Sequence, residues 1–127
     1  MQFVITAYDG EGMLDKRMEV RPRHLEGMER LKKHLVCAGG LLDEEGHLKG
    51  SVLVMEFQSR EEVDEYLANE IYVQEHVWEK ITVERMNVVY ALGERLGYTG
   101  IVFVRSSSYS MRGMNTVILS LNICHYE

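Results

Sequence analysis

The chain has 127 residues, of which 46% are hydrophobic, and it carries a formal net charge of −6. This length suits one compact domain, and the excess of acid argues against general binding to the nucleic-acid backbone, which requires a basic face. The two cysteines, Cys37 and Cys124, are far apart and form no CxxC motif, so we expect reduced thiols in a cytoplasmic protein. We expect no signal peptide and no membrane span, because no basic segment precedes a long apolar run.

The first part of the chain predicts a strand, two helices and a second strand. Residues 2–8, QFVITAY, alternate in polarity and end at the turn DGEG, which is typical of a strand. We expect a short helix over Leu14–Arg21, because Pro22 disfavours a helical conformation in the residue before it. A second helix is expected over Pro22–His34, with the proline in its first turn. Residues 35–42, LVCAGGLL, predict the second strand.

The next segments predict two more strands and one more helix. Residues 49–57, KGSVLVMEF, predict a third strand, and residues 78–89 predict a fourth. Ser59 and Glu62 form a capping box that opens a helix over residues 60–70. The resulting order is βαββαβ, which indicates an α+β ferredoxin-like fold with helices on one face of an antiparallel sheet. The strands are too apolar for a solvated second face, so we expect a dimer with sheet-on-sheet packing.

Residues 90–127 differ in composition from the domain that we predict over residues 1–89. No acidic residue lies between Glu94 and Glu127, and two apolar segments, GIVFVR and NTVILSLNI, flank the loop SSSYSMRGM. Exposed strands of this kind are prone to aggregate. We therefore expect a C-terminal β-rich extension, a hairpin that packs on the core or on a partner chain.

One histidine occupies an apolar helix position. On a helix that begins at Pro22, 4-3-4 spacing places His24 on one face with Met28, Leu31 and Leu35. Burial and the nearby helix N-terminus both disfavour a charged imidazolium, and a neutral histidine that is readily protonated suits a general base. From the residues alone, a core histidine is the commoner outcome.

Four polar residues could accompany His24, and each has an ordinary structural alternative. Asp9 follows the first strand, where it could reach the histidine or simply form the turn. Arg17 and Arg21 could hold an anionic substrate through forked hydrogen bonds, or could remain solvated cations. Ser51 opens the third strand, where it could offer a hydroxyl to a ligand or be a plain polar strand end.

Other types of site find little support in the sequence. The histidines match neither HxxxH nor HExxH, so we expect no metal. No Gly-rich phosphate-binding motif is present, so we expect no organic cofactor. Tyr72 and Trp78 are more typical of core or interface aromatic residues, and Cys37 of an inert buried thiol.

Several motifs together resemble the YciI-like family over about residues 1–89. Each motif is weak alone, but the combination is specific. One departure is Ile71, which stands where many relatives have proline, and this change is expected to loosen the wall of the pocket. The matching pieces are Asp9, the R...RP.HL block over residues 17–25, the AGG after the second strand, the GS that ends at Ser51, and the YV segment at Tyr72.

The resemblance implies a ferredoxin-like dimer with pockets near the surface where its two sheets meet. It also implies an active-site pair, His24 and Asp9, and one branch of the family is linked to chloride elimination from a chlorinated aromatic intermediate. We therefore expect an enzyme in which His24 abstracts a proton from a small anionic metabolite, in an elimination or isomerisation, while Asp9 orients the ring. The alternative is a dimeric module that binds a metabolite or a protein without catalysis. The residues expected to contact the substrate are Arg17, Arg21, Ser51 and Tyr72.

Overall fold

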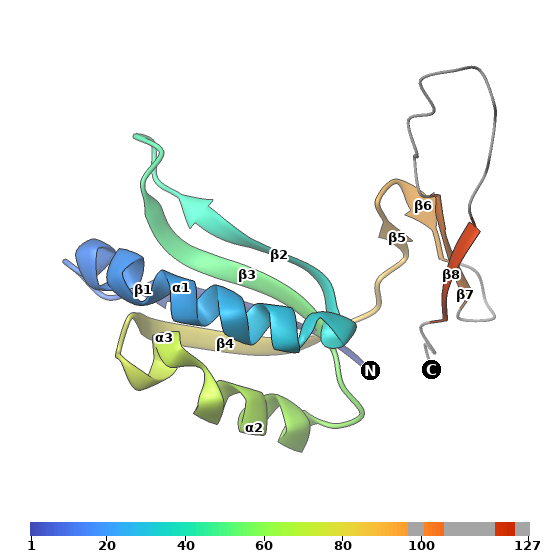
Figure 1. Cartoon of the computed structure of the whole chain (residues 1–127), viewed down its shortest axis with the longest axis horizontal. Helices are drawn as coiled ribbons and strands as arrows, with labels where there is room; N and C mark the ends of the chain where they lie inside the picture. The colour runs from blue at the N-terminus through green and yellow to red at the C-terminus, as the bar shows by residue number, and fades with distance from the viewer. Residues whose placement is uncertain (97–100, 106–118, 124–127) are drawn as a thin grey trace. The chain divides into compact units, whose positions relative to one another are not determined.

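The computed structural model describes residues 1–96, 101–105 and 119–123, and the chain divides into two compact units, Met1–Met86 and Asn87–Glu127. In the first unit the main elements follow the predicted order (Figure 1). They are β1 (Gln2–Asp9), α1 (Leu14–Arg30), the 3₁₀ turn η1 (Lys32–His34), β2 (Leu35–Leu42), β3 (Leu48–Glu56), α2 (Arg60–Asn69), α3 (Ile71–Gln74) and β4 (Trp78–Met86).

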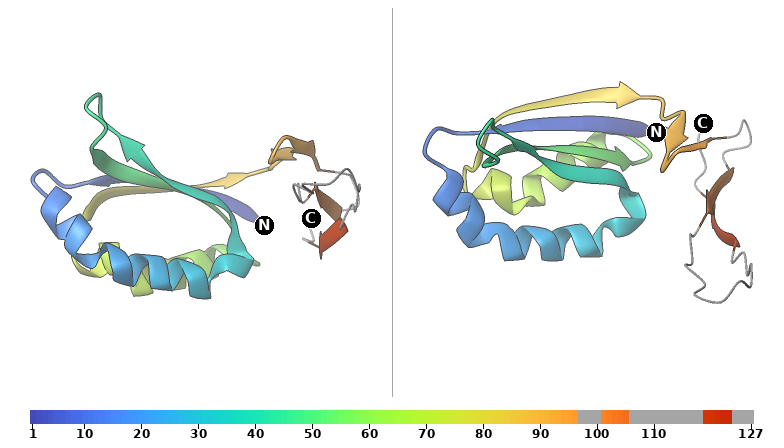
Figure 2. Two further views of the ribbon diagram at one scale, coloured as in Figure 1. Left: turned by 45° about the horizontal axis from the view of Figure 1, so that its top comes forward. Right: turned by 90° about the horizontal axis from the view of Figure 1, so that it is seen from above.

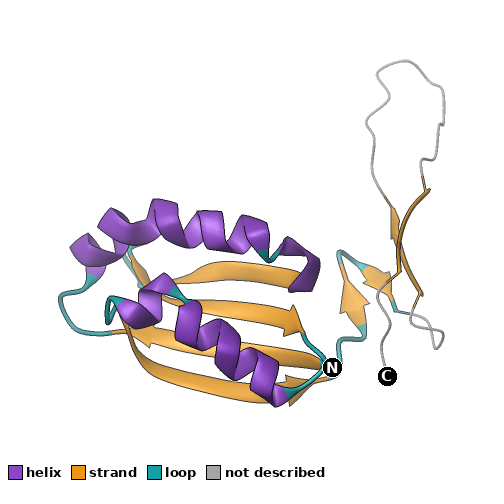
Figure 3. Ribbon diagram, turned by 60° about the horizontal axis from the view of Figure 1, so that its bottom comes forward, coloured by secondary structure: helices purple, strands orange, loops and turns teal. Residues whose placement is uncertain are grey.

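The four strands of the first unit form one antiparallel sheet in the order β2-β3-β1-β4. Both long helices, α1 and α2, lie on the same face of this sheet (Figures 2 and 3). This arrangement is the predicted α+β ferredoxin-like fold, in which β1 and β3 are the central strands.

The strand register decides which side chains enter the core. Ile5 of β1 lies opposite Leu53 of β3 and Val83 of β4, and the period of two in a strand turns all three toward the helices. Ile5 and Leu53 are almost fully buried there, together with Phe3 and Met55. The opposite face of the sheet carries the alternate residues of each strand, and its packing against a second sheet stays a prediction.

Helix α1 corrects the predicted break at Pro22. A single helix runs over Leu14–Arg30, although a proline in a helix removes one hydrogen bond and crowds the carbonyl four residues earlier. That carbonyl belongs to Met18, and both Met18 and Pro22 are exposed, so water can satisfy it. Val20 and Met28 hold the two halves on the core. His24 therefore lies in the middle of a helix, and the helix N-terminus predicted beside it is not there.

The second helical segment contains one predicted feature and one that was missed. Ser59 caps α2 as predicted, with its hydroxyl accepting a hydrogen bond from the Glu62 backbone N–H at 3.3 Å. The short helix α3 was not predicted, because four residues carry no periodic signal. Glu70 joins α2 to α3 and caps α3 with its side chain, which accepts a hydrogen bond from the Tyr72 N–H.

The described residues of the second unit include two pairs of antiparallel strands. Strands β5 (Tyr90–Ala91) and β6 (Glu94–Arg95) pair through a two-residue turn in which Leu92 and Gly93 both have positive φ, as in a type I′ turn. Strands β7 (Ile101–Arg105) and β8 (Leu119–Ile123) pair antiparallel. The loop SSSYSMRGM lies outside the described residues, and the packing of this unit on the core or on a partner stays a prediction. Within the described part of the chain, no helix combines the length and apolar character needed to cross a membrane.

Candidate functional site

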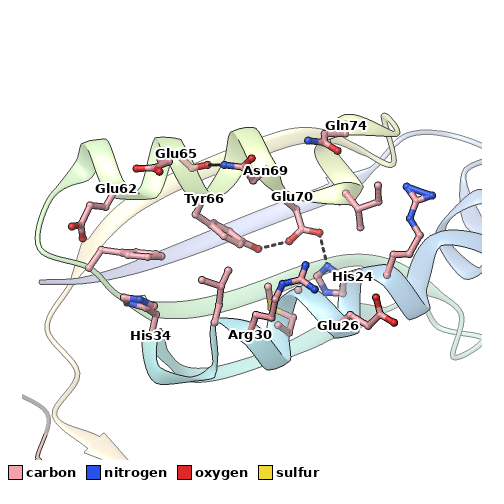
Figure 4. A pocket seen from close by; sticks show the side chains of 16 residues that line it. His24, Glu26, Arg30, His34, Glu62, Glu65, Tyr66, Asn69, Glu70 and Gln74 are labelled. Carbon is pink, nitrogen blue, oxygen red and sulfur yellow. Dashed lines mark hydrogen bonds and ion pairs between the residues drawn. The ribbon is translucent and has the colours of Figure 1, made fainter.

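Glu70 is the centre of a buried hydrogen-bond cluster between α1 and α2. Its carboxylate oxygen Oε1 lies 2.6 Å from His24 Nδ1 and accepts a hydrogen bond from the Tyr72 backbone N–H at 3.2 Å. Its other oxygen, Oε2, accepts a hydrogen bond from the Tyr66 hydroxyl at 2.6 Å. The Glu70 side chain is only 3% exposed, so these protein donors replace water around it (Figure 4). A buried acid with this many donors is typical of a carboxylate that stays ionised.

The electrostatics of the cluster favour the ionised form of Glu70. Burial raises the pKa of Glu70, but the hydrogen bond and charge of His24 and the hydrogen bonds from Tyr66 and Tyr72 together hold it below its ordinary value of 4.5. Burial, reinforced by the charge of Glu70 and the hydrogen bond to it, raises the pKa of the Tyr66 hydroxyl, which therefore stays a donor.

An ionised carboxylate can only accept hydrogen bonds, so it fixes the protonation of the histidine nitrogen beside it. His24 Nδ1 must carry a proton in order to bond Glu70 Oε1. In a neutral ring, Nε2 then has the free lone pair. Among the described residues, no hydrogen bond engages Nε2. The arrangement is that of a histidine base with a carboxylate partner.

Aromatic packing fixes the plane of the His24 ring. The ring stacks on Tyr72 with centroids 4.1 Å apart and planes 15° apart, and it meets Trp78 edge to face with centroids 6.1 Å apart. The His24 side chain is 11% exposed, and that exposed part lines a groove of about 670 Å³ between α1 and α2. Ile71 also lines this groove. The groove lies on the helix face of the sheet, whereas the predicted pocket adjoins the surface where two sheets meet, and that pocket stays a prediction.

The predicted pair of His24 and Asp9 does not occur among the hydrogen bonds of the described residues. Asp9 is instead bound at both oxygens by Arg17 Nη1, at 2.8 and 3.0 Å. Burial raises the pKa of Asp9 above its usual value of 3.8, and Arg17 opposes that rise. Arg17, seven residues before His24, thus takes the acid that the sequence had assigned to the histidine. The partner of His24 is Glu70, which the sequence analysis missed.

Three of the four residues predicted to bind substrate, Arg17, Ser51 and Tyr72, meet around the Arg17 guanidinium, and Tyr72 joins them to the His24 cluster. Arg17 is 4% exposed, and its Nη2 donates to the Ser51 hydroxyl at 2.7 Å while its guanidinium lies 4.7 Å from the centre of the Tyr72 ring. Arg21 is exposed, and its charge opposes the burial that raises the pKa of the Tyr72 hydroxyl. The residues that line the groove do not include Asp9, Arg17, Arg21, Ser51 or Tyr72.

A signal for Glu70 does exist in the sequence. Val63, Tyr66 and Glu70 follow 3-4 spacing and share the buried face of one helical segment, where an acid requires a partner. Most acids of this segment are exposed and need no partner, so the acid on the apolar face, Glu70, is the one that indicates a buried interaction. Within the described ranges, no group of three or more His, Cys, Asp or Glu side chains is arranged to hold a metal ion.

A family model of the YCII-related domain matches residues 1–87. The chain belongs to this family. YciI of Escherichia coli is 30% identical over 98 residues, an alignment that covers 71% of this chain and 100% of that protein. The resemblance predicted from the sequence motifs is thereby confirmed.

Two further relatives extend the comparison of this YCII-related domain. The aspercryptin biosynthesis cluster protein B of Emericella nidulans is 31% identical over 87 residues, which are 61% of this chain and 56% of the relative. This chain thus spans little more than half of that protein. A solved structure of 5-chloro-2-hydroxyhydroquinone dehydrochlorinase (TftG) from Burkholderia phenoliruptrix, in complex with 2,5-dihydroxybenzoquinone, is similar with a TM-score of 0.65 and 28% identity. That similarity covers 68% of this chain and 94% of the dehydrochlorinase.

Proposed function

We propose that the chain is a small-molecule enzyme in which His24 Nε2 is the general base of an elimination or isomerisation. One observation carries the proposal: Glu70 holds Nδ1 at 2.6 Å from a buried carboxylate, while the ring borders the groove between the helices. A base must be oriented and must face a space that a substrate can enter, and this histidine meets both conditions. Asp9, proposed from sequence as the partner, has a structural part in this scheme, since it neutralises Arg17.

The comparisons support an enzyme of this kind. The similar dehydrochlorinase removes the elements of hydrogen chloride from a small aromatic compound, as its name states, and this chain covers 94% of it. A dehydrochlorination needs a base for one proton and a path for the departing chloride, with no net change in oxidation state that would require an organic cofactor. The histidine–glutamate arrangement supplies that base.

The proposed step balances as a proton transfer. Nε2 takes a proton from an acidified C–H or O–H bond of the substrate, and the electron pair left behind forms a new double bond. In an elimination, the leaving group departs with its own bonding pair; in an isomerisation, the proton returns at another carbon. The Glu70 carboxylate stabilises the imidazolium without accepting its proton. General-base assistance of this kind contributes about 10²–10⁴-fold in rate.

Chloride release from 5-chloro-2-hydroxyhydroquinone tests the proposal. We expect turnover by the wild-type chain, a loss of about 10²-fold or more in His24→Gln, and a substantial loss in Glu70→Gln, with the folded state checked by circular dichroism. A His24→Gln variant as fast as the wild type would eliminate the proposed base. If the compound binds in the groove and is recovered unchanged, the alternative of a metabolite-binding module is favoured.

We also infer that two copies pack through the open face of the sheet. In the strand register, Val4 of β1 lies opposite Val54 of β3, and Val52 lies next to Val54 on the same face. Val4 and Val52 are only half-buried in one chain. A second copy would cover this face, as the family resemblance implies. Val52→Lys should then give a monomer in analytical ultracentrifugation, whereas the control Glu61→Lys on the far side of α2 should not. A monomeric wild-type chain would contradict the dimer.

A further inference from the structure

Gly27 leaves a bare patch of helix surface in the groove. It lies in the last turn of α1, and a glycine inside a helix lowers its stability relative to alanine. A Cβ built on Gly27 would meet only one heavy atom within 4 Å, the Arg30 Nη2 at 3.9 Å. The space above Gly27 therefore belongs to the groove that this residue lines, and no side chain of the described residues fills it.

Arg30 lies beside this space, and its charge has no ion-pair partner in the described part of the chain. Its guanidinium extends back over Gly27, since Nη2 lies within contact distance of a Cβ at that position. Among the described residues, no hydrogen bond or ion pair engages Arg30, whereas Arg17 binds Asp9 and Arg23 lies 3.5 Å from Glu75. A cation at the last turn of α1 also suits the helix dipole, but that effect does not require the guanidinium to lie over Gly27.

His24, Gly27 and Arg30 follow one another along the groove. Each step of three residues advances about 4.5 Å along a helix, and residues three apart share a face. The imidazole of His24 and the guanidinium of Arg30 thus flank the open surface at Gly27, and Figure 4 shows both side chains in the groove. Arginine presents a planar fork that matches the two oxygens of a carboxylate.

The rest of the groove limits the substrate further. Its floor and walls include the apolar side chains of Met28, Leu31 and Phe57. Of the acids that line it, Glu70 is satisfied by its three donors and Glu62 accepts a hydrogen bond from the Gln58 N–H, while Glu26, Glu62 and Glu65 have no ion pair among the described residues. These rim acids repel a second negative charge. The groove suits a compound with one planar oxyanion on an apolar body.

We propose that Arg30 binds the single carboxylate of an apolar substrate over the bare surface of Gly27, and that this contact presents the acidic bond to His24 Nε2. The inference rests on the proposed function, because it names the substrate class for the same site. It replaces Arg17 and Arg21, which do not line the groove, with an arginine that does. Arg30 is a substrate-binding residue, and Gly27 sets the shape of the surface that the substrate covers.

Three probes with the same benzene ring test this inference by NMR titration: benzoate, which has one negative charge, phthalate, which has two, and benzamide, which has none. We expect wild type to bind benzoate more tightly than the other two. Arg30→Gln should lower the affinity for benzoate by about tenfold or more, to the affinity for benzamide, because a charge-assisted hydrogen bond is lost. Arg23→Gln is the matched control, since Arg23 lines the same groove but is paired with Glu75; it should retain the affinity for benzoate.

Gly27→Ala should raise the melting temperature and weaken benzoate binding, because it adds a methyl group to a helix and to the floor of the groove. The inference is overturned if wild type does not prefer benzoate to benzamide, or if Arg30→Gln and Arg23→Gln bind benzoate equally well. His24→Gln distinguishes the two proposals. It should retain benzoate binding. If benzoate binding depends on Arg30 but turnover is unchanged in His24→Gln, only the proposed base is refuted.

Discussion

Tyr66→Phe removes one hydroxyl from the buried cluster and leaves the ring in place. The Tyr66 hydroxyl donates to Glu70 Oε2 at 2.6 Å, and Tyr66 is 6% exposed. The substitution creates little space, because only one oxygen atom is removed. It leaves one oxygen of a buried carboxylate without its donor, in a position from which water is largely excluded.

The expected cost follows from the charge on Glu70. A hydrogen bond to a charged group contributes about 1.5–3 kcal/mol, so we expect Tyr66→Phe to lower the free energy of unfolding by about 2 kcal/mol at neutral pH. The pKa of Glu70 is lower in the folded chain than its ordinary value of 4.5. A carboxyl group with a lowered pKa stabilises the fold above that ordinary value, and this contribution is lost as the pH falls through the folded pKa. The difference between wild type and Tyr66→Phe should therefore shrink on acidification.

Urea denaturation at neutral pH and at successively lower pH measures both effects. Tyr72→Phe is the matched control, because its ring also contacts His24 but no hydrogen bond of its hydroxyl is found among the described residues. We expect that control to lower the free energy of unfolding by less than Tyr66→Phe does, because it removes no hydrogen bond to a charged group. Equal losses in the two variants, or a Tyr66→Phe loss independent of pH, would refute the account of Glu70 as a buried, ionised acceptor.

Two further substitutions test the packing of the sheet and of the residues around Arg17. Gly50→Ala should lower the free energy of unfolding by about 1–3 kcal/mol, because its Cβ would collide with the backbone carbonyl of Ala7; Gly39→Ala, which meets nothing within 4 Å, is the control in the same denaturation experiment. Arg17→Met should cost about 3–5 kcal/mol by leaving Asp9 buried without its cation, and a loss no larger than that of an exposed ion pair would contradict this role.

The order of the elements could be predicted from sequence because each strand carries its own signal. Alternating apolar residues in β1 and the dense apolar run of β3 require burial, and a capping box at Ser59 locates the start of α2. The helix break at Pro22 was wrong for a tertiary reason. Local preference disfavours a helical conformation around the proline, but the core contacts of Val20 and Met28 outweigh that preference. The carbonyl that loses its hydrogen bond belongs to the exposed Met18, so water can satisfy it.

The candidate site could be predicted only in part. The apolar face of α1 identified His24, which the structure places beside the groove. The partner of His24 could not be assigned from the sequence, because the fold could bring either Asp9 or Glu70 next to the histidine. Only the tertiary packing decides between these two acids. Arg17 decides the pairing, because it lies in the first turn of α1 and binds Asp9, while His24 bonds Glu70.

The protonation of the His24 ring tests the central claim most directly. Long-range ¹H–¹⁵N correlation spectra of ¹⁵N-labelled protein distinguish the two neutral tautomers at mildly alkaline pH. Our account predicts that His24 carries its proton on Nδ1, toward Glu70, with an unprotonated Nε2, and that Glu70→Gln disturbs this pattern. A neutral His24 ring with its proton on Nε2 would contradict the account, because Nε2 could then not accept a proton from a substrate.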